Sequence, residues 1–327
     1  MGRYTASIWK CGIAVAICSA TSFPGLSQSK TELFRYGDFN SWITRNIPES
    51  QIIGGHTKTL YEIGPSQTID GAKAYKNLGG SPWATSNVYA KVMGISKGSC
   101  AVVPDTRAGS DKCAKLTTIM ERCKAVGIIN IDVVVAGSIF LGEMIEPIGS
   151  TSDPYSKMEM GIPFTRRPKA LCFDYRLEIP ANAGRVYSSG FGKKKELPGH
   201  ENAEVLVYLQ RRWEDEKGNI CAKRVGTARV RFDKSTSGWV NGYRLPILYG
   251  DITSSPDYRP YMGLIPADKS YYARNSKGKM VPVKEVGWDS ANAAPTHIIV
   301  MASAASGDAY TGTIGLTLWI DNICTAY

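Results

Sequence analysis

Apolar and polar side chains alternate strictly over residues 171–179, in the stretch LCFDYRLEI. Every second position is apolar, and the positions between hold Cys172, Asp174, Arg176 and Glu178. A period of two is typical of a strand with one buried face. The preceding loop is rich in proline and arginine, which excludes a helix there. The chain therefore enters this predicted strand from a rigid, basic loop.

Similar segments recur along the whole chain, and convincing amphipathic helices are not found. Valine, isoleucine, threonine and aromatic residues dominate these segments, which are separated by clusters of glycine, proline, asparagine and aspartate. The pattern predicts an all-β protein, an antiparallel β-sandwich. Short helices are expected only near Phe39–Thr44 or after Pro82. The predicted strands cover residues 88–94, 114–120, 133–142, 170–179, 203–213, 227–232, 296–303 and 315–321.

Composition does not change anywhere after the first 27 residues, and neither a repeat nor a low-complexity linker is found. We therefore expect a single domain over residues 28–327. Long insertions are predicted at 145–168, 180–202 and 250–295, because these segments hold most of the prolines and glycines. Loops of a sandwich are where binding sites usually develop.

Residues 1–27 have the pattern of a secretion signal. Arg3 and Lys10 precede the apolar run CGIAVAICSA, which is too short to span a bilayer, and cleavage before Gln28 is plausible. Lipid anchoring at Cys18 is the weaker alternative. The rest of the chain contains no apolar segment long enough for a membrane span. We expect export to the periplasm, the outer-membrane surface or the extracellular space.

The chain carries a net charge of +10, but its basic residues are scattered and have acidic neighbours. A nucleic-acid-binding protein would concentrate them on one element, so nucleic acid is not an expected partner. Solvated loops and strand edges explain most of the charge. An acidic polysaccharide or another anionic surface is the functional alternative.

Six cysteines lie outside the leader, and an even number in an exported chain predicts disulfides. The sequence leaves their pairing open. No C-x-x-C spacing and no nearby histidine supports a zinc site. The six are Cys100, Cys113, Cys123, Cys172, Cys221 and Cys324.

Several motifs resemble the putative carbohydrate metabolism domain family, PCMD. They are PWATSN at 82–87, CAKLTT at 113–118, MGIPFTRRPKALCFDYRLEIP at 160–180, and the closing segment at 295–327. The resemblance implies a β jelly roll of lectin-like architecture and a role in glycan binding or utilisation. It implies no established set of catalytic residues.

Carbohydrate recognition needs aromatic faces for the sugar ring and polar groups for its hydroxyls. The candidate ligand-binding residues form two pairs. Trp83 and Asn87 belong to a motif that is too polar for a plain core strand. Trp319 and Asp321 lie on the last predicted strand, where the indole is out of phase with its apolar neighbours. Packing in the core or at the rim is the alternative for both tryptophans.

Arg166 and Arg167 are further candidates at the mouth of the predicted strand, since a guanidinium can grip carboxylates or paired hydroxyls. They can equally pair with local acidic residues and hold the loop in place. Pro163 and Pro168 are expected to set the shape of the loop.

Catalysis has no clear signature in this chain. Glycoside hydrolysis would require two facing carboxyl groups, and the pairs Glu143–Glu146 and Asp174–Glu178 are only two of many. The motifs H-E-x-x-H and G-x-S-x-G are absent. No cofactor is expected, although a structural calcium ion held with the help of Asp132, Asp251 and Asp257 is possible.

We therefore expect first a non-catalytic, exported glycan-binding protein whose partner is a glycan or polysaccharide. The second hypothesis is a glycoside hydrolase with an unidentified carboxylate pair. The third is a cell-surface adhesin or structural subunit that binds protein partners.

Overall fold

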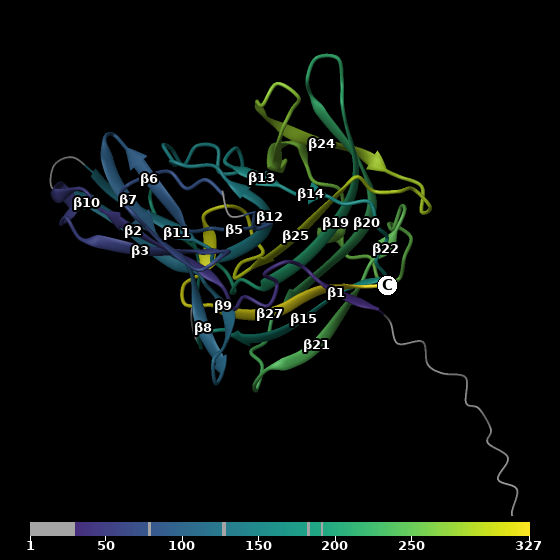
Figure 1. The fold of residues 1–327 in the computed structure, drawn as a ribbon, viewed down its shortest axis with the longest axis horizontal. Coiled ribbons are helices and arrows are strands. Elements are labelled where there is room, and N and C mark those ends of the chain that lie inside the picture. Colours follow the sequence, from purple (N-terminus) through teal and green to yellow (C-terminus); the bar gives the residue numbers. More distant parts are fainter. Residues whose placement is uncertain (1–29, 78–79, 126–128, 182–183, 191) are drawn as a thin grey trace, which may run out of the picture.

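The computed structural model describes residues 30–327 except 78–79, 126–128, 182–183 and 191. The predicted signal peptide, residues 1–27, lies outside the described residues. Two sheets packed face to face dominate the molecule (Figure 1), which confirms the predicted antiparallel β-sandwich. In the described part of the chain, no helix is long and apolar enough to cross a membrane.

The first sheet contains the strand predicted from strict alternation. Its strand order is β21–β15–β27–β9–β8, and β1 adds to the edge of β27. Leu171, Phe173 and Leu177 of β15 point into the sandwich core, as their spacing predicts. The strands are β1 (Thr31–Leu33), β8 (Val102–Ala108), β9 (Asp111–Thr117), β15 (Ala170–Glu178), β21 (Val240–Pro246) and β27 (Thr317–Ala326).

The second sheet folds back on itself. Its order runs β14–β25–β19–β20–β24–β23–β13–β12–β5, and β12 pairs with β25 as well as with β13. Strand β22 adds to β20. The strands are β5 (Trp83–Thr85), β12 (Ser138–Met144), β13 (Met158–Met160), β14 (Ile162–Pro163), β19 (Ala203–Glu214), β20 (Ile220–Phe232), β22 (Leu248–Tyr249), β23 (Tyr272–Arg274), β24 (Met280–Trp288) and β25 (His297–Ser303).

This folding gives the second sheet two buried faces. On β19, Val205 and Val207 enter the sandwich core, while Leu206 and Tyr208 enter a separate core inside the fold of the sheet. A strand buried on both faces has a nearly continuous apolar sequence, as AEVLVYLQ does. The inner core continues into the cleft described below.

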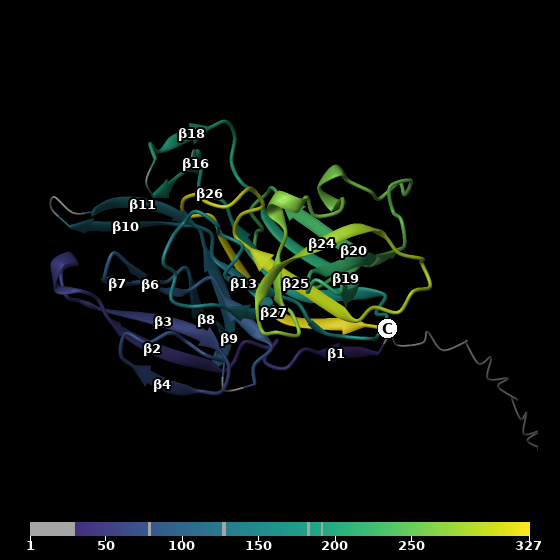
Figure 2. The same cartoon turned by 90° about the horizontal axis from the view of Figure 1, so that it is seen from above.

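Smaller sheets extend the molecule on one side, where they lie in layers (Figure 2). The hairpin β6–β7 packs against the β2–β3 sheet through Tyr89, Ile47 and Leu60. These strands are β2 (Trp42–Pro48), β3 (Thr57–Ile63) and β4 (Gln67–Asp70); β6 (Val88–Val92) and β7 (Ile95–Ser99); β10 (Ile119–Ala125), β11 (Ile129–Val135) and β17 (Ser189–Gly190); and β16 (Arg185–Tyr187), β18 (Lys195–Leu197) and β26 (Thr311–Thr313).

The predicted helices were wrong. Residues 42–48 form strand β2, and residues 83–85, just after Pro82, form strand β5. Phe39 has a left-handed backbone, with φ of 46°, which is incompatible with an α-helix at this point. The described residues contain only short 3₁₀ helices: η1 (Gln51–Ile53), η2 (Pro260–Met262) and η3 (Ala267–Lys269).

The segment 133–142, predicted as one strand, is divided between β11 and β12. The break lies at Gly137, which packs against the backbone of another strand. A Cβ atom at this position would lie 2.4 Å from the backbone nitrogen of Thr117. Only glycine allows this close approach, so the chain changes sheets here.

The predicted disulfides are not confirmed, because all six cysteines are free thiols in this structure. Cys172 and Cys324 are nevertheless direct partners in the register between β15 and β27. The sheet therefore brings together one pair that the sequence could not select.

Candidate functional site

The inner side of the folded second sheet opens into a cleft with a volume of about 450 Å³. Strands β19, β20 and β25 form its floor, and segments 154–158, 260–271 and 305–311 form its walls. A second hollow of about 510 Å³ continues the cleft past Tyr155 and Tyr310 towards Tyr187. Pockets of this size are typical of small-molecule and glycan sites.

A buried carboxylate lies at the floor of the cleft. Glu204 is held by Arg229, with nitrogen–oxygen distances of 2.8 and 2.9 Å, and by Arg231 at 2.8 Å. The Glu204 side chain is only 2% exposed. Two guanidiniums therefore hold the carboxylate in place by charge-assisted hydrogen bonds, and the bonds from Arg229 are bidentate. The floor of the cleft is rigid and carries more positive than negative charge.

Tyrosines supply the aromatic surface of the cleft. Tyr155, Tyr261 and Tyr310 are half-buried and line its walls, and Tyr155 makes an edge-to-face contact with Tyr271 at 6.1 Å. Burial raises the pKa of Tyr310 to about 12 and also raises the pKa of Tyr155. The phenols of Tyr155 and Tyr310 therefore stay neutral and can donate hydrogen bonds at physiological pH.

Charged and hydroxyl groups complete the rim. Lys269 forms an ion pair with Asp308, and Asp268 lies beside them along the second hollow. The serines Ser303 and Ser306 line the side near the floor. The cleft thus combines aromatic faces with polar side chains, as carbohydrate recognition requires.

Trp83 lies in the sandwich core and is 1% exposed. Its indole NH donates to the backbone oxygen of Arg35 at 3.0 Å, and its ring contacts Phe34 and Phe39 edge to face. The structure places this indole in the apolar core, which is the packing alternative, and its sugar-binding role stays a prediction. The polar neighbours of Trp83 serve the network around Asn87 instead.

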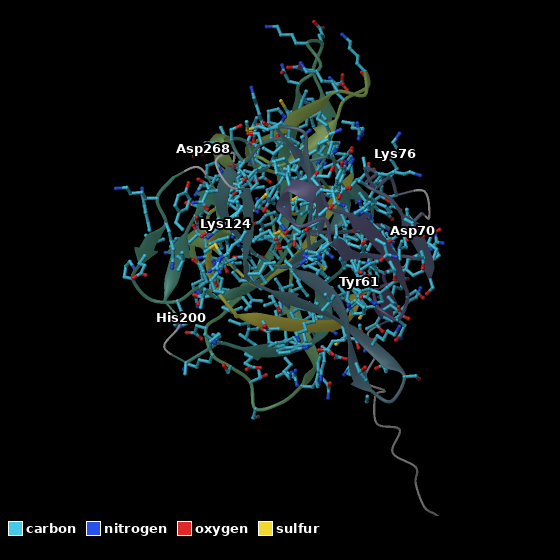
Figure 3. The ribbon with its side chains drawn as sticks, turned by 90° about the vertical axis from the view of Figure 1, so that its left-hand side faces the viewer. Tyr61, Asp70, Lys76, Lys124, His200 and Asp268 are labelled. Atoms are coloured by element: carbon cyan, nitrogen blue, oxygen red, sulfur yellow. The ribbon has the colours of Figure 1, made fainter. Side chains whose placement is uncertain are left out.

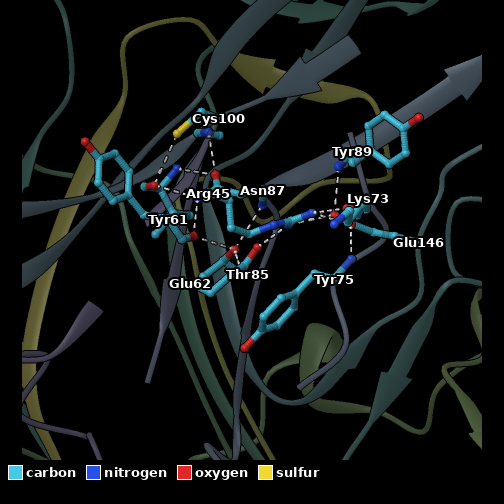
Figure 4. A network of polar contacts seen from close by, with 12 residues as sticks. Arg45, Tyr61, Glu62, Lys73, Tyr75, Thr85, Asn87, Tyr89, Cys100 and Glu146 are labelled. Atoms are coloured by element: carbon cyan, nitrogen blue, oxygen red, sulfur yellow. Dashed lines mark hydrogen bonds and ion pairs between the residues drawn. The ribbon is translucent and has the colours of Figure 1, made fainter. Parts of the chain in front are cut away.

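Asn87 is buried and all of its hydrogen-bonding groups are in use (Figure 4). Its amide nitrogen donates to the backbone oxygens of Tyr61 and Val102, both at 2.7 Å. Its side-chain oxygen accepts from the backbone nitrogens of Ala101 and Val102. These bonds give Asn87 a structural role that occupies its donors and acceptors, and its ligand-binding role stays a prediction.

Trp319 and Asp321 lie on the outer face of the first sheet, away from the cleft. Arg176 stacks on the Trp319 ring at 3.8 Å and leaves the residue 5% exposed. Asp321 is buried and accepts from Arg107 at 2.6 Å. Burial raises the pKa of Asp321 to about 6. The Trp319 indole lies on the face opposite its apolar neighbours, as its position in the sequence predicts, but the Arg176 guanidinium covers its ring.

Arg166 and Arg167 hold their loop in place. Arg166 pairs with Glu32 and lies over the ring of Tyr327 at 4.9 Å. Arg167 stacks on Tyr249 at 4.0 Å and donates to backbone oxygens of residues 291 and 293. Neither arginine lines the cleft, nor do Trp83, Asn87, Trp319 and Asp321.

Three of the four carboxylates considered for hydrolysis lie beside arginines outside the cleft. Glu146 is buried against Arg45 at 2.6 Å, and Glu143 lies near Arg274. Asp174 accepts from Arg107 at 2.7 Å, whereas Glu178 is exposed at the end of β15. Neither pair lines the cleft.

The residues named for calcium lie on different segments. Asp132 is on β11, whereas Asp251 and Asp257 follow β22. The described part of the chain contains no group of three or more histidine, cysteine or acidic side chains placed to hold a metal ion. The calcium site stays a prediction.

The tyrosines of the cleft were not predicted from the sequence, because the aromatic candidates were tryptophans. A usable signal was present: Tyr155, Tyr187, Tyr261 and Tyr271 all lie in the three predicted insertions. Those insertions supply much of the cleft wall. Aromatic residues within long loops would have been the better criterion.

Comparison with solved structures finds two from Bacteroides, each described as a putative glycoside hydrolase. The one from Bacteroides thetaiotaomicron is 18% identical with a TM-score of 0.42 and covers 83% of this chain and 74% of its own. The one from Bacteroides vulgatus is 15% identical with a TM-score of 0.44, and the match covers 90% of this chain and 94% of that chain.

A non-crystalline cellulose specific carbohydrate-binding module, CBM28, is 9% identical with a TM-score of 0.28 and covers 78% of this chain and 92% of its own. No curated protein gives a significant match. The family described as "Putative carbohydrate metabolism domain", PCMD, matches residues 58–239, which is more than half of the chain. The chain belongs to this carbohydrate-related family.

Proposed function

We propose that the protein binds a glycan, without cleaving it, in the cleft on the inner side of the second sheet. The observation that carries this proposal is the combination of half-buried tyrosines with a fixed, ion-paired floor. Export, predicted from residues 1–27, would expose the cleft to glycans of the periplasm or cell surface.

Sugar rings suit this arrangement on physical grounds. A pyranose presents an apolar face that stacks on an aromatic ring, while its hydroxyls both donate and accept hydrogen bonds. Tyr155, Tyr261 and Tyr310 offer rings on the walls, and Arg231 and Lys269 offer donors. The cleft, of about 450 Å³, and its continuation, of about 510 Å³, together leave room for more than one sugar unit.

Hydrolysis is less well supported, because it needs one protonated and one free carboxyl group on opposite sides of the sugar. Glu204 is the carboxylate at the floor, and both of its oxygens already accept hydrogen bonds from two arginines. Asp308 at the rim is paired with Lys269. Electrostatic pairing therefore favours positioning of a ligand over proton transfer to it.

A glycan array tests the proposal. Tyr261→Ala removes a ring from the cleft wall and should weaken binding about tenfold, since an aromatic contact contributes about 1 kcal/mol or more. Trp213→Ala is the matched control, because this indole is 39% exposed and lies outside the cleft. The control should retain wild-type binding and melting temperature.

The same purified protein should be screened for release of reducing sugars. We expect none. Release that Glu204→Gln abolishes would contradict the proposal and assign a hydrolytic role to the buried carboxylate. Equal binding by wild type and Tyr261→Ala would remove the cleft as the glycan site.

A further inference from the structure

We propose that a second, apolar groove beside the cleft binds the hydrocarbon part of a glycoconjugate, such as an alkyl or acyl chain. This inference rests on the proposed function, because the sugar of the same ligand would lie in the cleft. The groove lies between the hairpins β6–β7 and β10–β11 and has a volume of about 230 Å³.

Strand periodicity creates the groove. Each hairpin turns one apolar face towards the other, and the opposite face of β6–β7 is anchored through Tyr89 on the β2–β3 sheet. Alternate residues line the groove, namely Val88, Ala90 and Val92 from β6, and Ile131, Val133 and Val135 from β11.

Most of the groove lining is apolar, and two of its four charged side chains, Lys97 and Glu121, form an ion pair with each other. Lys97 of β7 pairs with Glu121 of β10 at 2.9 Å and with Glu49 at 3.3 Å. Water inside the groove therefore finds few hydrogen-bonding partners, and its release by an apolar ligand is favourable. A hydrocarbon matches this lining better than a sugar does.

The groove adjoins the glycan cleft, and the two share lining residues. Pro154 and Tyr310 line the groove, the cleft and its continuation, and Ser150 and Thr151 line both the groove and the continuation. Thr151 is fixed by a 2.8 Å hydrogen bond to the backbone oxygen of Ser189. One ligand can therefore place a polar head on one side of Tyr310 and an apolar tail on the other.

The surroundings favour a narrow chain over a protein partner. Lys91, Arg122 and Lys124 are exposed on the hairpin faces that point away from the groove, and Met93, at the turn between β6 and β7, is an exposed apolar side chain beside them. Figure 3 views the molecule from the end that carries these hairpins and labels Lys124, an exposed residue of β10. A folded partner would have to bury these cations to reach the apolar lining, at a cost in desolvation.

Calorimetry with methyl, butyl, hexyl and octyl β-D-glucoside, each below its micellar concentration, tests the inference. For wild type, Kd should tighten about three- to fourfold per buried methylene until the groove is filled. Ala90→Phe should fill the groove and abolish this dependence on chain length. Lys91→Ala, the neighbouring outward-facing residue, should behave like wild type.

A second variant, Val133→Asn, makes the groove polar without adding bulk and should reduce the chain-length dependence even if Ala90→Phe folds poorly. Both groove variants should still bind the glycan identified on the array. Melting temperatures measured in parallel establish that each variant is folded.

The outcomes separate the two proposals. A flat chain-length series for wild type, with glycan binding on the array intact, would overturn the groove and leave the proposed function standing. A steep series without glycan binding on the array would overturn the glycoconjugate and the proposed function together. A dimer that octyl glucoside dissociates would assign the groove to a second copy of the chain and also overturn the proposal.

Discussion

Arg45 bridges two carboxylates in a part of the molecule that is closed to water (Figure 4). It contacts Glu62 at 2.7 Å and Glu146 at 2.6 Å. One guanidinium can neutralise only one of two anions. Burial accordingly raises the pKa of Glu62 to about 7, so this side chain takes up a proton near neutral pH.

The raised pKa predicts a pH dependence of stability. The folded protein holds the Glu62 proton above pH 4.5, where the unfolded chain has released it. The stabilising contribution is therefore complete below pH 4.5 and is lost as the pH rises to about 7. Glu62→Gln, which imitates the protonated form, should gain about 1–3 kcal/mol relative to wild type across this window.

Urea unfolding at pH 4.5, 6 and 8 measures the difference between the two proteins. Asp70→Asn, at an exposed position, is the control and should follow wild type. Parallel stability profiles for wild type and Glu62→Gln would contradict the assignment.

The buried position of Trp83 predicts that removal of its indole strongly destabilises the ligand-free protein. Trp83→Ala should lower the free energy of unfolding by about 3–5 kcal/mol, because it leaves a cavity in the sandwich core. Trp213→Ala, at an indole that is 39% exposed, should change it by less than about 1 kcal/mol. Chemical denaturation compares them, and similar losses would show that Trp83 is not part of the core.

Residue identity alone could not distinguish these roles. Trp83 and Asn87 occur in a polar motif, yet the polar groups bond to the backbone of distant strands, including Tyr61 and Val102. Trp319 is out of phase on its strand, yet Arg176 from the adjacent strand covers it. Both outcomes depend on partners that the local pattern does not specify.

At the scale of elements, the register of β15 against β27 places Cys172 opposite Cys324. With oxidised glutathione as the disulfide donor, we expect these two thiols to join first, since none of the other four cysteines has a cysteine as its strand-register partner among the described residues. Burial raises the pKa of Cys324 to about 11, so the exchange should be slow at neutral pH and faster in alkaline buffer.

Peptide mapping without reduction checks this pairing. Cys324→Ser should remove the cross-linked peptide and leave Cys172 without a disulfide partner, while the other four thiols stay free in both proteins. Cross-links between other cysteines before this one forms would show that the register does not control oxidation.

Strands with a local signature were predicted well, and their partners were not. The alternation at 171–179 identified β15, and the apolar run at 203–213 identified β19, because both patterns follow directly from the side-chain period. The break between β11 and β12 at Gly137 was not predicted, because it depends on contact with Thr117 in another strand. Local sequence indicates a strand, but distant backbone decides where the strand ends.

For the molecule as a whole, the pairing of β12 with β13 closes the second sheet and so forms the cleft. Gly142 makes this pairing possible, because a Cβ atom there would lie 2.0 Å from the backbone oxygen of Glu159. Its φ of 145° also disfavours any other residue. The sequence predicted a sandwich, but it contained no sign that one sheet would fold back.

Gly142→Ala should therefore destabilise the protein by about 2 kcal/mol or more and weaken glycan binding, because the cleft walls separate. Gly149→Ala is the matched control, since no atom lies within 4 Å of the position that its Cβ would occupy. Thermal melting and the glycan array measure both effects. Normal binding by a folded Gly142→Ala protein would show that closure of the sheet is not needed for the site.

The aromatic lining of the cleft consists of tyrosine, and none of the tryptophans among the described residues contributes to it. Tryptophan emission, excited at indole wavelengths, should therefore not change when a saccharide binds. Ultraviolet difference spectra of the phenol band should respond instead. A screen that relies on indole emission alone would discard true ligands of this protein.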